Sequence, residues 1–480
     1  MSGRSHLPYL LFVGFVCLVL AAAWHRPLMS PDSWVLYDIS RWLWHSETVT
    51  GIRQYRVATD LPISHPFFYP ALIGGLDQVL GTGFRSGLII NALAILALPW
   101  FIYLAIEPIA ESKKNAVVIS GVATAGLCLN WFFLEEVIAG RTIPITACLM
   151  ALALRFFFLG AQQHRLIFAA KLGLVLGVLA LTRFDTLSFS AVLILGTFLV
   201  WTGGIKRWLA LLIVAALFFV GYSPYLIYSI QCCGTALATE TQGIAAIAPP
   251  IRPTTYWPAT PPTLFEAPAI WMERLARSSF DSGKALVLAF AISPLPMLLV
   301  FTSLFPGIVV KRSQRSTLLL ILPILALASM ALGPVLFSFP QGRYFVLPIT
   351  FACSIIAAYM GSALFNHSLH SARLNVVVIC AGVVGIAGCG YGWSRSTPLL
   401  PPSIISAAVE CAAGARLLVK GQRGPEIATR GRASTLLEPD NWNDLTNTEK
   451  DQFTTEYGVR AIFDPESGSC QRLRNPEHAS

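Results

Sequence analysis

Residues 7–45 read LPYLLFVGFVCLVLAAAWHRPLMSPDSWVLYDISRWLWH and place two different kinds of helix next to each other. The first part, 7–23, is an apolar run, and a helix needs roughly 20 such residues to cross about 30 Å of hydrocarbon. The second part opens with Ser30, a favoured N-cap, and with Pro31 at the first helical position. It then mixes aromatic with charged side chains. The stretch therefore predicts a membrane span followed directly by a helix at the membrane surface.

The whole chain has the composition of a membrane protein. Of its 480 residues, 55% are hydrophobic and 12% are charged, against about 25% charged residues in a soluble globular chain. This excludes disordered, collagen-like and nucleic-acid-binding proteins. The 34 Lys and Arg exceed the 25 Asp and Glu and give a formal charge of +9, which fits basic loops on the cytoplasmic side of a membrane.

Eleven windows are apolar and long enough to span: 7–23, 86–106, 116–134, 143–160, 166–182, 185–201, 208–230, 284–309, 317–337, 344–365 and 374–393. A further window, 66–82, is short, is interrupted by Pro70 and two glycines, and carries Asp77. Ala21-Ala22-Ala23 also resembles a signal-peptidase site, so cleavage of the first span stays open. We expect an all-α polytopic membrane protein of about eleven transmembrane helices.

The basic residues decide the expected orientation. They gather in short loops, at Lys113, Lys114, Arg165, Lys171, Lys206, Arg207, Lys311, Arg312, Arg315 and Arg373. All these loops lie on the side of the N-terminus only if 66–82 does not cross. We therefore expect 66–82 to lie in the outer interface, with a cytoplasmic N-terminus and with 24–85, 231–283 and 394–480 facing outward.

The polar tail from residue 394 predicts a small soluble α/β domain, so we expect a transmembrane module, 1–393, and an extracytoplasmic domain, 394–480. Residues 415–419 and 459–463 predict strands, and Thr446-x-x-Glu449 is a capping box that opens a helix ending near Gly458. Cys411 and Cys470 can form a disulfide in an oxidising compartment. The tail contains no zinc-type, nucleotide-binding or hydrolase motif.

Asp32 lies in the first turn of the helix predicted after the first span. One interpretation is that it compensates the helix dipole of a surface helix. The other is that it acts as a general base held against the bilayer. Along the same helix, Asp38, Arg41 and His45 fall together on a polar face, and we count Asp38 and Arg41 as further candidates for the site.

Two arginines in predicted outer turns have acids close by in the sequence. Arg141 follows Glu135 and Glu136, and Arg183 precedes Asp185. Local ion pairing is therefore one explanation for both arginines, and binding of an anion is the other.

Arg343 has no acid nearby in its segment, Phe339-Pro340-Gln341-Gly342-Arg343-Tyr344. A guanidinium group matches a phosphate well, so Arg343 is the best candidate to hold an anion such as a lipid phosphate. His65, in Ser64-His65-Pro66-Phe67-Phe68-Tyr69-Pro70, is either a second phosphate contact or an interfacial histidine.

The order of these features resembles that of the membrane-embedded C-type (GT-C) glycosyltransferases, which include protein O-mannosyltransferases and the lipid A aminoarabinose transferase. The matching features are the outward Asp32, the segment His65-Pro66-Phe67-Phe68-Tyr69-Pro70, the loop 231–283, Arg343-Tyr344 and the tail 394–480. Ser33 follows Asp32 where the O-mannosyltransferases have an acid, which leaves that substrate class in doubt.

The resemblance implies a glycosyltransferase of the cell envelope, in a bacterial inner membrane with a periplasmic C-terminal domain. It would move a hexosyl or pentosyl sugar, with inversion, from a polyprenyl-phosphate donor to a glycan, lipid or protein acceptor. Asp32 would be the general base. Arg343, His65, Arg183 and Arg141 would bind the donor phosphate, with Tyr344 as a further candidate. Some relatives use a divalent metal at the acidic loop, and the sequence leaves this open.

Two alternatives come from other classes of protein. A transporter or flippase generally has polar sites near the bilayer midplane and repeated halves, whereas the charges here lie at the predicted outer ends of the spans. A non-catalytic membrane scaffold can keep a fold without its chemistry.

Overall fold

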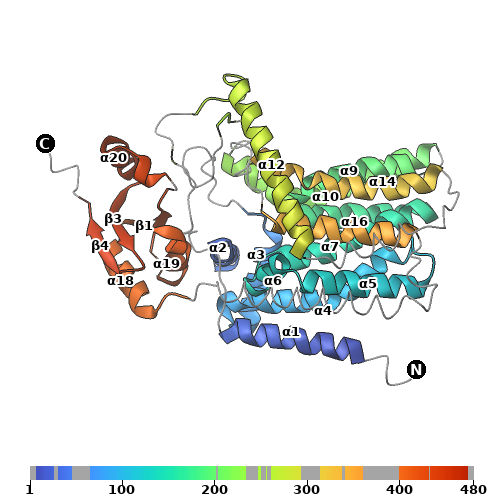
Figure 1. Cartoon of the computed structure of the whole chain (residues 1–480), viewed down its shortest axis with the longest axis horizontal. Coiled ribbons are helices and arrows are strands. Elements are labelled where there is room, and N and C mark those ends of the chain that lie inside the picture. The colour runs from blue at the N-terminus through green and yellow to red at the C-terminus, as the bar shows by residue number, and fades with distance from the viewer. Residues whose placement is uncertain are drawn as a thin grey trace.

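The computed structural model describes residues 7–25, 31–45, 65–201, 204–233, 247–249, 256, 261–292, 314–337, 341–360, 399–431, 433–439 and 441–473. In this part of the chain, helices lie side by side in a bundle and a small α/β unit lies at one end of it (Figure 1). The predicted span 374–393 and the N-cap Ser30 lie outside the described residues, as do the distal parts of the windows 284–309 and 344–365.

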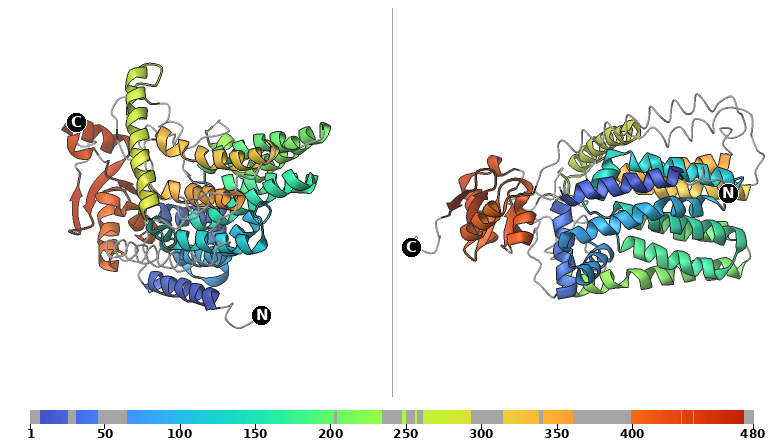
Figure 2. Two further views of the ribbon diagram at one scale, coloured as in Figure 1. Left: turned by 45° about the vertical axis from the view of Figure 1, so that its right-hand side comes forward. Right: turned by 90° about the horizontal axis from the view of Figure 1, so that it is seen from below.

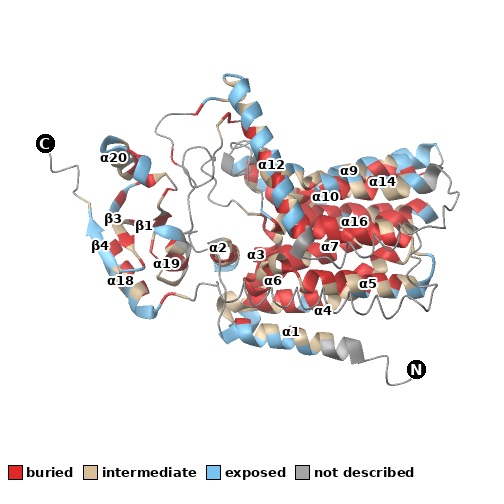
Figure 3. Cartoon of the chain, in the orientation of Figure 1, coloured by how far each residue is buried: buried red, intermediate tan, exposed pale blue. Residues whose placement is uncertain are grey.

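The bundle contains α1 (Leu7–His25), α4 (Ser86–Ile106), α5 (Lys113–Cys128), α6 (Trp131–Ile138), α7 (Ile143–Gln163), α8 (Leu166–Ala180), α9 (Thr186–Val200), α10 (Ile205–Cys233), α14 (Gln314–Ser329), α15 (Leu332–Phe337) and α16 (Arg343–Met360). Helix α12 (Pro268–Ile292) runs obliquely to them in Figure 1. Buried residues are concentrated on the helices in the middle of the bundle (Figure 3). Helices α8 and α10 approach closely at Gly177, where the absence of a side chain makes room. A Cβ on Gly177 would lie 2.5 Å from the Phe218 carbonyl oxygen. Small residues permit such contacts between membrane helices.

Four helical segments of the described part are long and apolar enough to cross a membrane: Gly83–Ile106, Ile143–Gln163, Ile205–Gln231 and Thr317–Leu336. Helices α5 and α6 together make a fifth if the pair counts as one span. The apolar helices support an integral membrane protein, and the number of eleven spans stays a prediction.

The window 116–134 differs from the straight span that the sequence predicts, because the chain bends by 71° between α5 and α6. Asn130 is the N-cap of α6, the helix that follows the bend. Its side-chain oxygen accepts hydrogen bonds from the backbone N–H groups of Phe132 and Phe133, at 2.9 and 3.4 Å. An asparagine N-cap of this kind opens a new helix. The bend directs α6 toward the end of the bundle that carries α2.

Helix α2 (Pro31–His45) is seen end-on in Figure 1 and runs across the end of the bundle in Figure 2. Helix α3 (Phe68–Leu80) packs against it. The Trp44 indole donates to the Ala71 carbonyl oxygen at 3.0 Å, and a Cβ on Gly74 would lie 2.2 Å from the Trp44 ring. With 13 residues, α3 is about 20 Å long, which is too short to cross about 30 Å of hydrocarbon.

The C-terminal unit contains α18 (Pro402–Ala412), β1 (Arg416–Val419), α19 (Gly424–Gly431), β2 (Thr435–Leu437), α20 (Asn447–Glu456), β3 (Val459–Asp464) and β4 (Ser469–Arg472). Short 3-10 turns at 421–423 and 442–444 also belong to this unit, and another at 83–85 precedes α4 in the bundle. The strand order is β2-β1-β3-β4, with β1 parallel to β2 and β3, and β4 antiparallel to β3. The predicted strands, the capping box of Thr446 and Glu449 and the disulfide Cys411–Cys470 are confirmed. The boundary at 393 stays a prediction.

Within the described ranges, a helix and a loop residue contact this unit from the rest of the chain. Helix α19 packs against α2, the helix that begins with Asp32 in its first turn. Tyr256, from the predicted loop 231–283, is fully buried among aromatic side chains of the unit. Its hydroxyl donates to Glu456 at 3.2 Å, and its backbone exchanges two hydrogen bonds with the Asn441 side chain at 3.1 and 2.8 Å.

Candidate functional site

Three segments that are distant in the sequence meet at the end of the bundle beside α2. Asp32 lies in the first turn of α2, Arg141 in the turn between α6 and α7, and Arg343 at the first position of α16. One oxygen of Asp32, Oδ2, lies 3.4 Å from Nη2 of Arg343 and 3.8 Å from Nη1 of Arg141. The Asp32 side chain keeps 43% of its surface exposed, so a substrate can reach this carboxylate.

A second carboxylate, Glu136, lies beneath the two arginines and is only 2% exposed. Its Oε1 atom is 2.8 Å from Nη1 of Arg141 and 3.3 Å from Nη1 of Arg343. A buried charge is stable only when it is paired, and Glu136 is paired twice. Glu135 binds the other terminal nitrogen of Arg141 at 2.7 Å. The local ion pairs considered for Arg141 are therefore present, and Arg141 also reaches Asp32.

The turn that carries Arg141 is held from behind by Asn91 of α4. The buried Asn91 amide donates to the carbonyl oxygens of Glu136 at 3.2 Å, Val137 at 3.2 Å and Arg141 at 2.9 Å. The hydroxyl of Tyr69 in turn donates to the side-chain oxygen of Asn91 at 3.0 Å. Tyr69 and the site candidate His65 both belong to the segment 65–70. Through Tyr69 and Asn91, this segment also supports the position of Arg141.

Arg183 is occupied by its own acid, as local pairing predicts. Its Nε and Nη2 donate to the carboxylate of Asp185, with 2.8 Å for the Nη2 contact, and Nη1 donates to the Thr142 hydroxyl at 3.3 Å. The ring of Tyr344 connects Arg183 to the site, because the guanidinium carbons of Arg183 and Arg343 lie 5.6 and 5.3 Å from its centroid. Such contacts stabilise cations against an aromatic face.

The surrounding charges set the protonation of Asp32 and His65. The partial removal of Asp32 from water raises its pKa, but the positive charges of Arg343 and then Arg141 lower it by more, and the net pKa lies below the ordinary value. Burial lowers the pKa of His65, and the negative charge of Asp32 offsets this only in part. At neutral pH the site therefore contains an ionised Asp32 and a neutral His65.

A cavity of about 590 Å³ opens beside Arg343, between α6, α12 and the start of α16. Its lining combines polar with apolar side chains: Phe132, Glu135, Asp281, Lys284, Ala285, Leu288, Gln341, Gly342 and Arg343. A Cβ at position 342 would lie 2.3 Å from the Phe132 ring. Glycine at this position therefore allows the backbone before α16 to pack directly against Phe132 in the cavity wall. Arg343 touches both the cavity and Asp32, and thereby joins the two.

The two further candidates on α2, Asp38 and Arg41, lie farther along the helix than Asp32. Asp38 is only 5% exposed, so it lies on a buried side of α2, and its part in the site stays a prediction. It lies six positions after Asp32, which in a helix of 3.6 residues per turn is about 9 Å farther along and on another side. Arg41 is about half a turn around from Asp32 by the same count.

Glu136 is the functional candidate that sequence reasoning missed. It was considered only as a local partner of Arg141. The available signal is the pair of acids, Glu135 and Glu136, that follows the apolar window 116–134, since ionisable groups at such positions are costly and usually paired.

The site fits arginine pairing better than metal binding. Within the described ranges no three His, Cys, Asp or Glu side chains are grouped so that they can hold a metal ion. Asp32, Glu135 and Glu136 each contact a guanidinium group instead.

Comparisons with known proteins identify the fold. No family model and no curated protein sequence matches the chain. Among solved structures, ArnT from Cupriavidus metallidurans bound to undecaprenyl phosphate has a TM-score of 0.57 and 14% identity, over 95% of this chain and 91% of that one. The oligosaccharyltransferase AglB from Archaeoglobus fulgidus, in complex with an inhibitory peptide and a dolichol-phosphate, has a TM-score of 0.53 and 11% identity, over 100% and 75%.

An oligosaccharyltransferase from Archaeoglobus fulgidus in complex with Zn and sulfate has a TM-score of 0.54 and 12% identity, over 94% of this chain and 67% of that one. At these identities the comparisons establish the fold alone. They confirm the resemblance to GT-C membrane glycosyltransferases that the order of sequence features indicates.

Proposed function

We propose that this chain is an integral membrane glycosyltransferase that transfers a sugar from a polyprenyl-phosphate donor to an acceptor, with inversion. The observation that carries the proposal is the 3.4 Å contact between Asp32 and Arg343 at the edge of a cavity, within a GT-C fold. The solved neighbours support the donor class, since ArnT is bound to undecaprenyl phosphate and AglB to a dolichol-phosphate.

The proposed orientation has the Asp32 end of the bundle outside and the N-terminus in the cytoplasm of a bacterial cell, with 394–480 as a periplasmic domain. Lys113 begins α5 directly after the far end of α4, and Lys171 lies in the first half of α8. Both are therefore at the end opposite Asp32. Basic residues at that end fit the cytoplasmic side of a membrane.

In the proposed reaction Asp32 accepts the proton of the acceptor hydroxyl. The acceptor oxygen forms a bond to the anomeric carbon while the bond from that carbon to the phosphate oxygen breaks. The electron pair of the broken bond leaves with the polyprenyl phosphate. A positioned base of this kind is worth typically 10²–10⁴ in rate, and the pKa of Asp32 lies on the side that keeps it ionised.

Arg343 is the arginine best placed to stabilise the departing phosphate. Its side chain is 20% exposed and lines the cavity, whereas Arg141 is 5% exposed and held by two glutamates. A preformed cation next to developing negative charge lowers the barrier most in a site of low dielectric. Arg141 and Arg183 then position Asp32 and Tyr344, and the neutral His65 is a candidate hydrogen-bond partner of the phosphate.

The test is a turnover assay of purified protein in lipid with a panel of radiolabelled polyprenyl-phosphate sugars. Wild type is compared with Asp32→Asn and with Asp451→Asn, a control on the exposed side of α20. Release of polyprenyl phosphate by wild type and by the control, but not by Asp32→Asn, supports the proposal. Movement of intact donor across the bilayer without cleavage would support a flippase instead, and neither activity would support a scaffold.

A further inference from the structure

A second cavity, of about 650 Å³, lies at the end of the bundle opposite Asp32. The ends of α4 and α7 form it together with the beginnings of α5 and α8. Arg155 lies 14 residues beyond Arg141 along the segment that forms α7, which is about 21 Å at 1.5 Å per residue. The cavity is therefore separate from the site described above and lies toward the other membrane surface.

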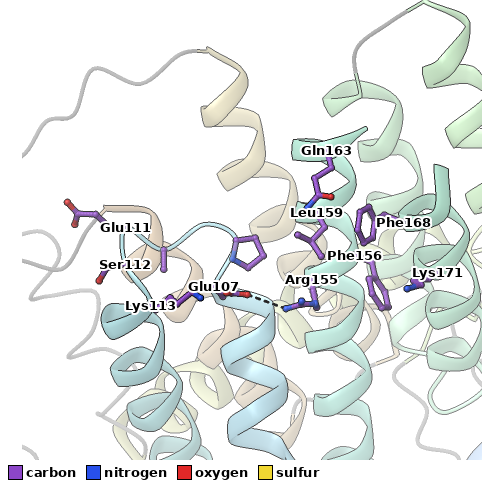
Figure 4. A pocket seen from close by; sticks show the side chains of 12 residues that line it. Glu107, Glu111, Ser112, Lys113, Arg155, Phe156, Leu159, Gln163, Phe168 and Lys171 are labelled. Carbon is purple, nitrogen blue, oxygen red and sulfur yellow. Dashed lines mark ion pairs between the residues drawn. The ribbon is translucent and has the colours of Figure 1, made fainter. Parts of the chain in front are cut away.

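Positive charge surrounds this cavity on several sides. Figure 4 shows the pair of Glu107 and Arg155 between Lys113 on one side and Phe156 and Lys171 on the other. The ion pair is long, with 3.6 Å between Nη1 of Arg155 and the Glu107 carboxylate, and the same nitrogen donates to the Leu104 carbonyl oxygen at 2.9 Å. Among the described residues both contacts of Arg155 use Nη1, which leaves its other guanidinium nitrogens for a ligand.

The two lysines of the lining, Lys113 and Lys171, are also free to contact a ligand. Lys113 and Lys171 are exposed, and within the ranges that the structure describes neither forms an ion pair. The ammonium group of Lys171 lies 5.7 Å from the centroid of the Phe156 ring. With Glu107 and Glu111 as the acids of the lining, the cavity keeps an excess of one positive charge.

Apart from Ser112 and Gln163, the uncharged side chains of the lining are apolar. Phe156, Leu159 and Phe168 form the wall next to Lys171 (Figure 4). A cavity with cations at its rim and aromatic and aliphatic side chains along its wall matches an amphiphile that carries a phosphate. Basic pockets between membrane helices bind anionic lipid headgroups in this way.

We propose that this cavity binds the phosphate group of an anionic phospholipid, held by Arg155, Lys113 and Lys171. The apolar wall contacts the glycerol and the upper part of the acyl chains. The assignment does not depend on glycosyl transfer, because it rests on a different cavity and on different residues.

The experiment measures phospholipid binding to the full chain in detergent by native mass spectrometry, with phosphatidylglycerol and phosphatidylcholine as probes. Wild type is compared with Lys113→Gln/Lys171→Gln. The matched control is Lys206→Gln/Arg207→Gln, which removes two exposed positive charges at the start of α10. All these side chains are exposed, so the variants are expected to fold, and thermal unfolding verifies this.

We expect wild type and the control to bind phosphatidylglycerol in preference to phosphatidylcholine, and the Lys113→Gln/Lys171→Gln variant to bind it roughly 10- to 30-fold more weakly. An equal loss in both double variants would assign the effect to overall charge and overturn the proposal. So would unchanged binding in Lys113→Gln/Lys171→Gln. Displacement of phosphatidylglycerol by inorganic phosphate at an equal concentration would assign the site to free phosphate and overturn the lipid proposal.

Discussion

The carboxylate of Glu136 lies 3.3 Å from the guanidinium group of Arg343, although 207 residues separate them in the chain. Glu136 is almost completely buried, and Arg343 is the arginine that reaches both Asp32 and the cavity. The buried Glu136 therefore holds one side of the Arg343 guanidinium group, while the exposed side of that group faces Asp32 and the cavity.

Replacing Glu136 with glutamine is expected to destabilise the protein. The change leaves Arg141 and Arg343 with one shared partner fewer in a buried environment, and breaking a buried ion pair costs about 3–5 kcal/mol. Thermal unfolding in detergent measures the effect. Glu135→Gln is the matched control, because Glu135 is 40% exposed and an exposed pair contributes about 0–1 kcal/mol. Equal unfolding temperatures for the two variants would contradict the role of Glu136.

Arg343→Ala is expected to weaken binding of undecaprenyl phosphate roughly 10- to 100-fold, the range for losing a hydrogen bond to a charged group. Arg343→Lys should fall between this variant and wild type, since an ammonium group cannot form the two-pronged contact of a guanidinium. Direct lipid binding to purified protein measures both. Arg277→Ala, on the exposed side of α12, serves as the control, and unchanged affinity in Arg343→Ala would remove Arg343 from the donor site.

The pH dependence of turnover should follow Asp32. Arg343 and Arg141 hold the pKa of Asp32 below its ordinary value, so the ionised base is present at neutral pH and is lost only as the pH falls below about 3.9. The same shift means that ionised Asp32 stabilises the fold above its unfolded-state pKa and that this contribution disappears in acid. In Arg343→Gln the acid limb of kcat/KM should move to higher pH.

His65 should produce no inflection near the usual histidine value of about 6.5, because burial lowers its pKa and keeps it neutral there. The same pH profile of kcat/KM tests this expectation. A rate that falls between pH 7 and 6 in wild type but not in His65→Gln would show that His65 titrates in that range.

Tyr256→Ala should loosen the C-terminal unit, because a fully buried aromatic ring is removed from between Phe453 and Tyr457. Large-to-small changes of this kind cost about 3–5 kcal/mol. Hydrogen exchange of α20 and β3 should become faster in Tyr256→Ala. In Tyr256→Phe, which loses only the hydroxyl contact to Glu456, exchange should remain close to wild type. Identical exchange in the alanine variant would show that the ring contributes little there.

Local patterns in the sequence were sufficient for much of the architecture. Apolar length predicts the bundle helices, Thr446 and Glu449 predict the start of α20, and the local sequence at 415–419 and 459–463 predicts β1 and β3. These features depend on residues close together in the chain, so they can be read without the fold. The bend at Asn130 differs because its N-cap signal is hidden inside an apolar run.

The charged cluster has a mixed origin. The sequence by itself determined that this is a membrane protein with ionisable residues at the predicted outer ends of its helices, including Asp32, Arg141 and Arg343. Only the tertiary structure decided that these three meet, that Glu136 lies beneath them and that Asp38 is buried. The physical reason is that hydrophobicity selects which segments enter the bundle, whereas the pairing of charges depends on how distant helices pack against one another.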